Sequence, residues 1–227
     1  MKVRTIEVKQ NIYASNDAVA DELRREMKKR GTLMLNVMSS PGSGKTTALV
    51  ALINLLKGQY RIAEMDVDIE SSLDAQRVAD KTGVPSYQIH NCGLCHIDAD
   101  MTMRALREFD IRDTDLIFLE NIGNLVCPAE FDTGAAKNVM LFSVPEGDDK
   151  PLKYPLMFSK SDLVLINKID TLPAFDFDVE KAKERILALN PNAEIICVSA
   201  KTGEGMEQVV AWVKREYLAF TNEKKDE

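Results

Sequence analysis

The chain has 227 residues, of which 45% are hydrophobic and 29% charged, and its net charge is −7. This balance is typical of a globular protein, and the length suits one α/β domain or a tight pair. A net acidic chain is a poor match for nucleic acid or an anionic membrane, so we expect neither as a partner. The amino terminus lacks the apolar core of a signal peptide, and the apolar runs are too short to cross a bilayer. We therefore expect a cytoplasmic protein whose four cysteines form no disulfide framework.

Helices and strands are predicted to alternate along the chain. Asn16 is expected to cap a first helix that runs to about Lys29 and ends at Gly31. The other expected helices are 45–57, 71–81, 98–109, 179–189 and 205–218, and the expected strands are 33–38, 61–67, 116–120, 139–144, 163–167 and 194–198. This alternation predicts a mostly parallel central sheet with helices on both faces. Ligands of such sheets bind at the carboxyl ends of the strands.

The segment SSPGSGKT, from Ser39 to Thr46, follows the first expected strand and opens a helix. Its glycines let backbone N–H groups wrap an anion, and the helix N-terminus adds positive potential. Lys45 suits the β- and γ-phosphates of a nucleotide, and the Thr46 hydroxyl suits Mg²⁺. The plain alternative is a glycine-rich turn, and Ser39 stands where the usual pattern has glycine. We assign nucleotide phosphate binding to Gly42, Ser43, Gly44, Lys45, Thr46 and Thr47.

Magnesium requires more oxygen ligands than one hydroxyl supplies. Asp66 and Asp68 end the second expected strand, and Glu120 ends the strand before Gly123. Many GTPases have Asp-x-x-Gly at the latter position, so glutamate keeps the carboxylate there. Asp74 is a further candidate for a magnesium ligand, although it can equally be interpreted as an exposed acidic residue of a helix. The predicted magnesium ligands are Thr46, Asp68, Asp74 and Glu120, and the predicted catalytic residues are Lys45, Thr46, Asp68 and Glu120.

An apolar strand ends in Asn167-Lys168-Ile-Asp170, the N-K-x-D pattern. The Asp170 carboxylate can accept both N1–H and N2–H of guanine, whereas adenine lacks those donors and would leave it unpaired. The Lys168 stem can lie over the base, and Asn167 can tie this loop to the phosphate loop. The next strand leads into Ser199, Ala200 and Lys201, whose backbone N–H groups suit the guanine O6. The order of these motifs predicts a guanine-nucleotide site that binds GTP and GDP.

The cysteines form an unusual pattern, Cys92-Gly-Leu-Cys95-His96 with Cys127 further on. Thiolates with imidazole suit Zn²⁺ or Ni²⁺. Small cysteines packed in the core are the alternative, and Cys197 in an apolar strand fits it. We reject haem attachment, because the sequence shows no export signal and the segment lies inside a nucleotide domain. A thioredoxin-like redox pair is a weak interpretation, because the motif does not follow the first strand of a redox fold. We expect His90 to be structural, with metal ligation as the lesser alternative.

Cys127 lies seven residues after Glu120 in ENIGNLVCP. A metal held by Cys127 would therefore respond to the γ-phosphate through the same segment.

The strings SSPGSGKT, GLCHIDADM, ENIGNLVCPAEFDTG, VPEGDDKPLKYPLMF and NKID together resemble the hydrogenase nickel-insertion GTPases, the HypB family. The resemblance covers about residues 16–212. It implies a homodimeric P-loop GTPase of the SIMIBI class, which includes the signal-recognition and MinD-like proteins. It also implies a metal site of Cys95, His96 and Cys127 at the subunit interface. The implied partners are a nickel-binding accessory protein and the hydrogenase large-subunit precursor.

Some members of the family carry an N-terminal cysteine motif for tight nickel binding, and others carry a histidine-rich tract for nickel storage. This sequence has neither. No cysteine precedes Cys92, and the chain has only two histidines, so tight nickel storage is not expected. The alternatives are a sibling metallochaperone GTPase for another nickel enzyme such as urease, or a non-hydrolysing metal-binding protein. A targeting GTPase for nascent chains or membranes is a third alternative, but the basic or methionine-rich extension expected of one is not seen in this sequence. We expect one GTPase domain over residues 1–221, with slow turnover, and a disordered tail over residues 222–227.

Overall fold

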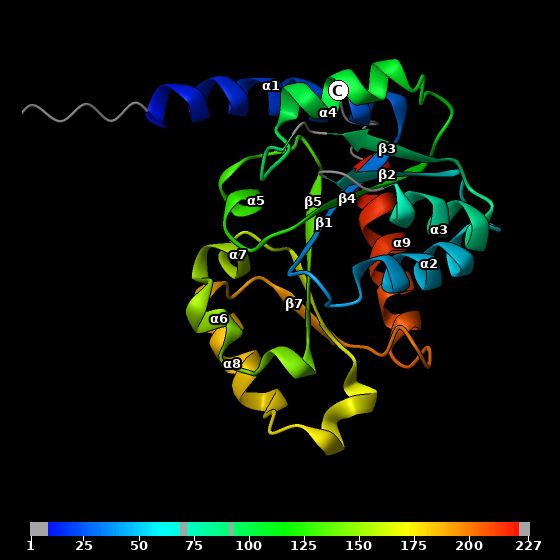
Figure 1. The fold of residues 1–227 in the computed structure, drawn as a ribbon. Helices are drawn as coiled ribbons and strands as arrows, with labels where there is room; N and C mark the ends of the chain where they lie inside the picture. The colour runs from blue at the N-terminus through cyan, green and yellow to red at the C-terminus, as the bar shows by residue number, and fades with distance from the viewer. Residues whose placement is uncertain (1–8, 69–71, 91–92, 223–227) are drawn as a thin grey trace, which may run out of the picture.

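A seven-stranded parallel sheet crosses the molecule in the order β3-β2-β4-β1-β5-β6-β7 (Figure 1). This computed structural model describes residues 9–68, 72–90 and 93–222. The strands are β1 (Leu33–Ser39), β2 (Ile62–Asp68), β3 (Ser86–His90), β4 (Leu116–Gly123), β5 (Lys137–Ser143), β6 (Leu163–Asn167) and β7 (Glu194–Cys197). The helices are α1 (Lys9–Arg30), α2 (Lys45–Leu56), α3 (Leu73–Thr82), α4 (Ala99–Glu108), α5 (Cys127–Glu130), α6 (Lys150–Lys153), α7 (Pro155–Ser159), α8 (Val179–Leu189) and α9 (Met206–Asn222). Short 3-10 segments span Val144–Glu146 and Ile169–Ala174.

Both faces of the sheet are covered by helices, because successive strand residues point to opposite sides. On β1, Leu33, Leu35 and Val37 pack with α2 and α9. Met34 faces the other side, where α1 and α4 lie together, and Met38 packs with α7 and α8 on that same side (Figure 1). Every residue of β1 is therefore buried, which explains its mostly apolar sequence.

One sequence-based expectation about the elements is wrong, and four of the described helices and strands were not predicted. Asn16 does not cap the first helix, because α1 already begins at Lys9. The edge strand β3 was not predicted, because its sequence SYQIH buries only Ile89 fully and shows no apolar run. The short helices α5, α6 and α7 were also missed, since they are too short to show a helical repeat.

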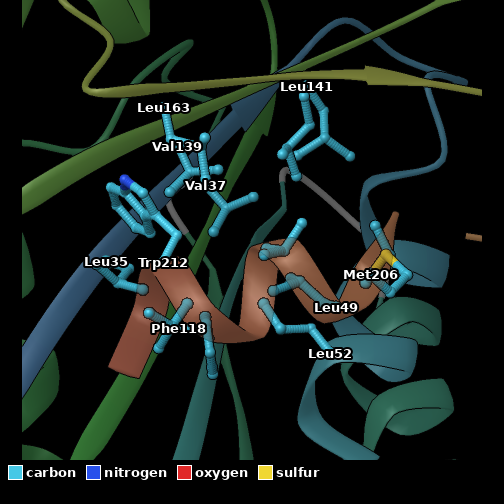
Figure 2. A pocket seen from close by; sticks show the side chains of 14 residues that line it. Leu35, Val37, Leu49, Leu52, Phe118, Val139, Leu141, Leu163, Met206 and Trp212 are labelled. Atoms are coloured by element: carbon cyan, nitrogen blue, oxygen red, sulfur yellow. The ribbon is translucent and has the colours of Figure 1, made fainter. Parts of the chain in front are cut away.

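The core between the sheet and α9 contains one small apolar cavity of about 20 Å³. Figure 2 shows side chains from β1, α2, β4, β5, β6 and α9 converging on it, with Trp212 and Met206 at its two ends. A space of that size holds about one water molecule and offers no polar partner. It is therefore a packing gap in the core rather than a ligand site.

The polar residues predicted for the site gather where β1, β2, β4 and β6 end. Because all these strands are parallel, their carboxyl ends meet at one edge of the sheet. None of the described helices combines the length and the apolar character needed to cross a bilayer.

Candidate functional site

The loop between β1 and α2 has the backbone of an anion cradle. Gly42 and Gly44 adopt positive φ angles of 75° and 95°, which only glycine takes readily. Helix α2 begins at Lys45, directly after Gly44, so its free N–H groups face the loop. The Lys45 Nζ lies 2.8 Å from Glu120 Oε1, and the Thr46 hydroxyl donates to the same oxygen over 2.7 Å. The cation and the hydroxyl that would meet a phosphate and its metal are thus held together by one carboxylate.

This loop lines a pocket of about 470 Å³. Its lining residues are Ser39–Thr47, Asp68, Asp74, Arg77, Ile122 and Gly123. Asp68, at the end of β2, and Asp74, in the first turn of α3, are therefore brought to the phosphate loop as the sequence predicts. Asp74 also pairs with Arg77, at 3.4 Å between Oδ1 and Nη1.

Beneath the pocket, three carboxyl groups are buried together. Glu64 and Asp66 of β2 and Glu120 of β4 are at most 3% exposed, and each offers an oxygen within 4.8 Å of the others. Each also has a buried oxygen without a hydrogen-bond partner among the described residues. Ser86 donates to Glu64 from the neighbouring β3.

Burial raises the pKa of Glu64 to about 9, and the hydrogen bond from Ser86 opposes part of this rise. Burial, followed by the negative charge of Glu120, raises the pKa of Asp66 to about 7. Glu120, which accepts the Thr46 hydroxyl, and the neighbouring Asp66 each offer an unpaired oxygen of the hard kind that Mg²⁺ prefers, so the residues present fit that ion.

The base-reading loop after β6 is tied to the phosphate loop by side chains. Asn167 Nδ2 donates to the Ser43 carbonyl over 2.9 Å, and Lys168 Nζ donates to the Gly42 carbonyl over 2.6 Å. Asn167 Oδ1 in turn accepts the Ala200 N–H at 3.2 Å. A Cβ on Gly44 would lie 2.8 Å from Asn167 Nδ2, which explains why glycine is needed there.

Asp170 is held by the segment that follows β7. The Ser199 hydroxyl, which is completely buried, donates to Asp170 Oδ1 over 2.6 Å. Ala200 and Lys201 follow in the same turn, and the Lys201 side chain is exposed. The structure thus brings the two predicted halves of the base site, 167–170 and 199–201, into direct contact.

A separate cluster of thiols and imidazole lies near α5. Cys95 Sγ lies 2.7 Å from Cys127 Sγ, and 3.9 Å from Nδ1 of His96. The His96 ring stacks on Phe131, with centroids 3.7 Å apart and planes 8° from parallel. All three predicted ligands therefore meet, while Cys92 lies outside the described residues. Cys197 is half-buried at the end of β7, far along the sheet from this group.

The protonation of this cluster is set by its contacts. The hydrogen bond with Cys95, followed by burial, raises the pKa of Cys127 above its ordinary value. Burial lowers the pKa of His96, which favours the neutral imidazole that binds metals. A metal would have to displace the thiol protons, so its affinity must fall in acid.

Some residues of the site were not assigned from the sequence. Glu64 was overlooked, although Glu64, Asp66 and Asp68 alternate along β2 and so lie on one face, the face covered by α2. That alternation was a usable signal. Phe131 was also missed, and nothing in the sequence indicates that it stacks on His96.

Comparison with known proteins shows which family this chain resembles. The family model described as "CobW/HypB/UreG, nucleotide-binding domain" matches residues 33–197. "Hydrogenase maturation factor HypB" of Azotobacter vinelandii is 46% identical over 213 residues, which are 94% of this chain and 70% of that protein. "Hydrogenase/urease maturation factor HypB" of Helicobacter hepaticus is 40% identical over 216 residues, which are 93% of this chain and 88% of that one.

Solved structures show the same likeness. HypB from Helicobacter pylori, crystallised in complex with nickel, has a TM-score of 0.83 and 39% identity over 89% of this chain and 95% of that one. The signal recognition particle receptor FtsY from Elizabethkingia anophelis has a TM-score of 0.53 at 12% identity, covering 84% of this chain and 68% of that one. The latter likeness concerns the fold alone, and it agrees with the expected SIMIBI-class architecture.

Proposed function

This chain belongs to the HypB proteins of the CobW/HypB/UreG family, and from this premise we propose that it is a GTP-hydrolysing metallochaperone. Its cargo is nickel, or zinc in its place, and its task is to assist nickel insertion into [NiFe]-hydrogenase. The reaction converts GTP and water to GDP and phosphate. We propose one GTPase domain over residues 1–221 that acts in the cytoplasm, where thiols stay reduced.

Phosphate binding rests on the loop between β1 and α2. The backbone N–H groups of this loop surround the phosphates, and Lys45 neutralises charge on the β- and γ-phosphates. Mg²⁺ would be held by Thr46, Asp68, Asp74 and Glu120, and it would neutralise further phosphate charge. Turnover is slow, because the guanidinium that lines the pocket, that of Arg77, is paired with Asp74.

Guanine is selected by Asp170, whose carboxylate accepts the two N–H donors of the base. The bond from Ser199 supports this role, because it fixes the rotamer of the carboxylate. Asn167 and Lys168 hold the base loop against the phosphate loop.

The cargo ion is bound by Cys95, His96 and Cys127. Three donors from one chain leave a tetrahedral ion one ligand short, which a second copy of the chain completes in a homodimer. Leu94 and Val126 support such an interface, since they are 47% and 52% exposed directly beside the thiols. The further partners are a nickel-binding accessory protein and the hydrogenase large-subunit precursor. Urease is a second candidate recipient, because the Helicobacter hepaticus relative carries both enzymes in its name.

One observation carries the proposal. Glu120, buried beneath the phosphate pocket, binds Lys45 and Thr46. The chain that continues from it reaches Cys127, seven residues on, in contact with Cys95. Nucleotide and cargo sites therefore share one short segment. A change at Glu120 on phosphate binding has a direct path to the metal, which couples the affinities of the two ligands.

The test is a titration of Ni²⁺ and Zn²⁺ into the full chain loaded with GDP or with a GTP analogue. We expect the affinity for metal to differ between the two nucleotide states, and Cys95→Ala, His96→Ala and Cys127→Ala to lose most of it. Cys197→Ala is the matched control, because that cysteine lies away from the cluster. Unchanged stoichiometry and affinity in all three cluster variants would place the metal site elsewhere.

The enzymatic part has its own test. Lys45→Ala removes the phosphate cation and should abolish Mg²⁺-dependent GTP turnover while the fold, followed by circular dichroism, is retained. An unchanged rate in this variant would refute the assignment of the phosphate site.

A further inference from the structure

Asn16 occupies an unusual place for an amide side chain, in the middle of α1 and 9% exposed. Its Oδ1 accepts the backbone N–H of Ala99 over 2.9 Å. Its Nδ2 donates to the backbone carbonyl of Asp132, also over 2.9 Å. One side chain therefore joins two backbone segments that are distant in sequence from it and from one another.

These two segments are the ones that carry the thiol–imidazole cluster. Ala99 follows His96 by three residues, at the start of α4, and Asp132 follows Cys127 by five. We call them the histidine arm (93–99) and the cysteine arm (127–132). The arms touch through the contact between Cys95 and Cys127 and through the stack of His96 on Phe131. Asn16 joins them a second time, from the side of α1.

Apolar side chains of α1 also pack on α4, beyond the histidine arm, whereas its other polar contacts with this region reach the cysteine arm and the turn after it. Arg24 Nη1 lies 2.8 Å from Oδ1 and 2.9 Å from Oδ2 of Asp132. Leu23 packs so closely on Gly134 that a Cβ there would lie 2.6 Å from it. The turn beyond the cysteine arm is thus fixed to α1 independently of Asn16. What Asn16 adds is the hydrogen bond that registers the histidine arm against it.

The chemistry of the bridge requires an amide. The asparagine side chain offers both a donor for the carbonyl of Asp132 and an acceptor for the N–H of Ala99. Aspartate would keep the acceptor but lose the donor, and its charge would repel the carbonyl oxygen. Alanine would lose both bonds and leave two buried backbone groups unpaired.

We propose that Asn16 is a positioning residue of the thiol–imidazole cluster: by bonding both arms, it sets the separation of the Cys95 and Cys127 thiols. The metal-binding part of this proposal rests on the proposed function, whereas the thiol geometry does not. Asn16 acts through the backbone and touches no cargo ion itself. Partners that orient metal ligands in this way typically change metal affinity by 10- to 100-fold when removed.

The first experiment measures thiol pairing without metal. In the full chain carrying Cys92→Ser and Cys197→Ser, only Cys95 and Cys127 remain of the four cysteines. Oxidised glutathione takes two electrons and two protons from these thiols, which yields one intramolecular disulfide and two molecules of reduced glutathione. The equilibrium constant is the effective concentration of one thiol beside the other. We expect Asn16→Ala and Asn16→Asp to lower it about tenfold or more, by analogy with the cost of misorienting paired groups.

Asn190→Ala is the matched control. Asn190 also bonds two backbone groups, donating to the Ser161 carbonyl over 2.9 Å and accepting from the Asn192 N–H over 3.1 Å. It therefore reports the effect of removing an amide that bonds two backbone groups away from the cluster. We expect it to leave thiol pairing unchanged.

The second experiment titrates Ni²⁺ into the parent and the same variants. The Asn16 variants should keep one ion per cluster but bind it about 10- to 100-fold more weakly, while Asn190→Ala binds as the parent does. If Asn16→Ala fails to fold, Asn16→Asp carries the test, since it retains the acceptor for Ala99. Parent-like thiol pairing in a folded Asn16 variant, or an equal loss in Asn190→Ala, overturns the inference. A parent that binds no Ni²⁺ at the cluster would refute the proposed function, and the glutathione equilibrium would still decide the role of Asn16.

Discussion

At the scale of single residues, the proposed role of Asp170 in selecting the base can be tested directly. We predict that Asp170→Asn weakens GTP binding about a hundredfold or more, because the amide replaces an acceptor that two guanine donors require. The same variant should gain affinity for xanthosine triphosphate, whose extra carbonyl matches the new amide donor. Calorimetric titration of both nucleotides into parent and variant measures the exchange. An unaltered preference for GTP would show that the base is recognised elsewhere.

Glu64 is a single residue that makes the stability of the fold depend on pH. Its pKa is about 9 in the folded protein and 4.5 as the ordinary value, so between these pH values the folded state keeps a proton that the unfolded state loses. Stability therefore falls as pH rises through this window, and becomes constant above it. Glutamine does not titrate, so Glu64→Gln removes this loss of stability at high pH. We predict that parent and variant are similarly stable at pH 5, and that the variant is more stable at pH 9.

Urea unfolding of both proteins in the absence of divalent ions measures this difference. A constant offset between the two curves at all pH values would contradict the prediction.

At the scale of elements, the absence of a side chain at Gly134 allows Leu23 of α1 to pack closely against the turn that contains it. Gly134 and Gly203 both have positive φ, 79° and 87°, but a Cβ meets Leu23 at 2.6 Å only at the former and nothing within 4 Å at the latter. Both alanine variants carry the same backbone strain, so their difference isolates the clash. We predict that Gly134→Ala is less stable than Gly203→Ala by about 1–3 kcal/mol, the usual cost of overpacking. Equal midpoints of chemical unfolding would mean that α1 shifts without cost.

The elements around the proposed nucleotide site could be predicted well from the sequence. The elements around the proposed cargo site could not. β6 and α8 were predicted with the observed bounds, because an apolar strand ending in Asn167 and a capped helix both leave strong local patterns. The contact of Asn167 with the phosphate loop also follows from its motif. Asn16 was misread, since its capping preference is local whereas its actual bonds are to residues 99 and 132. Long-range bonds of this kind leave no periodic signal in a sequence.

At the scale of the whole molecule, dimerisation should depend on the apolar residue beside the thiols. Val126→Glu places a charge on a side chain that is 52% exposed in the single chain and buried in the proposed dimer. We predict that this variant stays monomeric with Ni²⁺ and a GTP analogue, because an unpaired charge is costly to desolvate. Leu218→Glu, on α9 and 54% exposed, is the control and should dimerise normally.

Sedimentation velocity distinguishes the two states, and nucleotide titration verifies that both variants still bind GTP. A dimer that persists in Val126→Glu would place the interface on another face.

The bonds from Asn167 and Lys168 to the phosphate loop have a consequence for nucleotide exchange. They join the loop after β6 to the phosphate loop through the protein's own hydrogen bonds. The conformational entropy of ordering these loops is therefore lost during folding rather than at binding. We therefore expect departing GDP to leave behind two loops that are still joined by these bonds. The rate of exchange should then depend on the contacts of the nucleotide itself, without a helper protein that reshapes the loops.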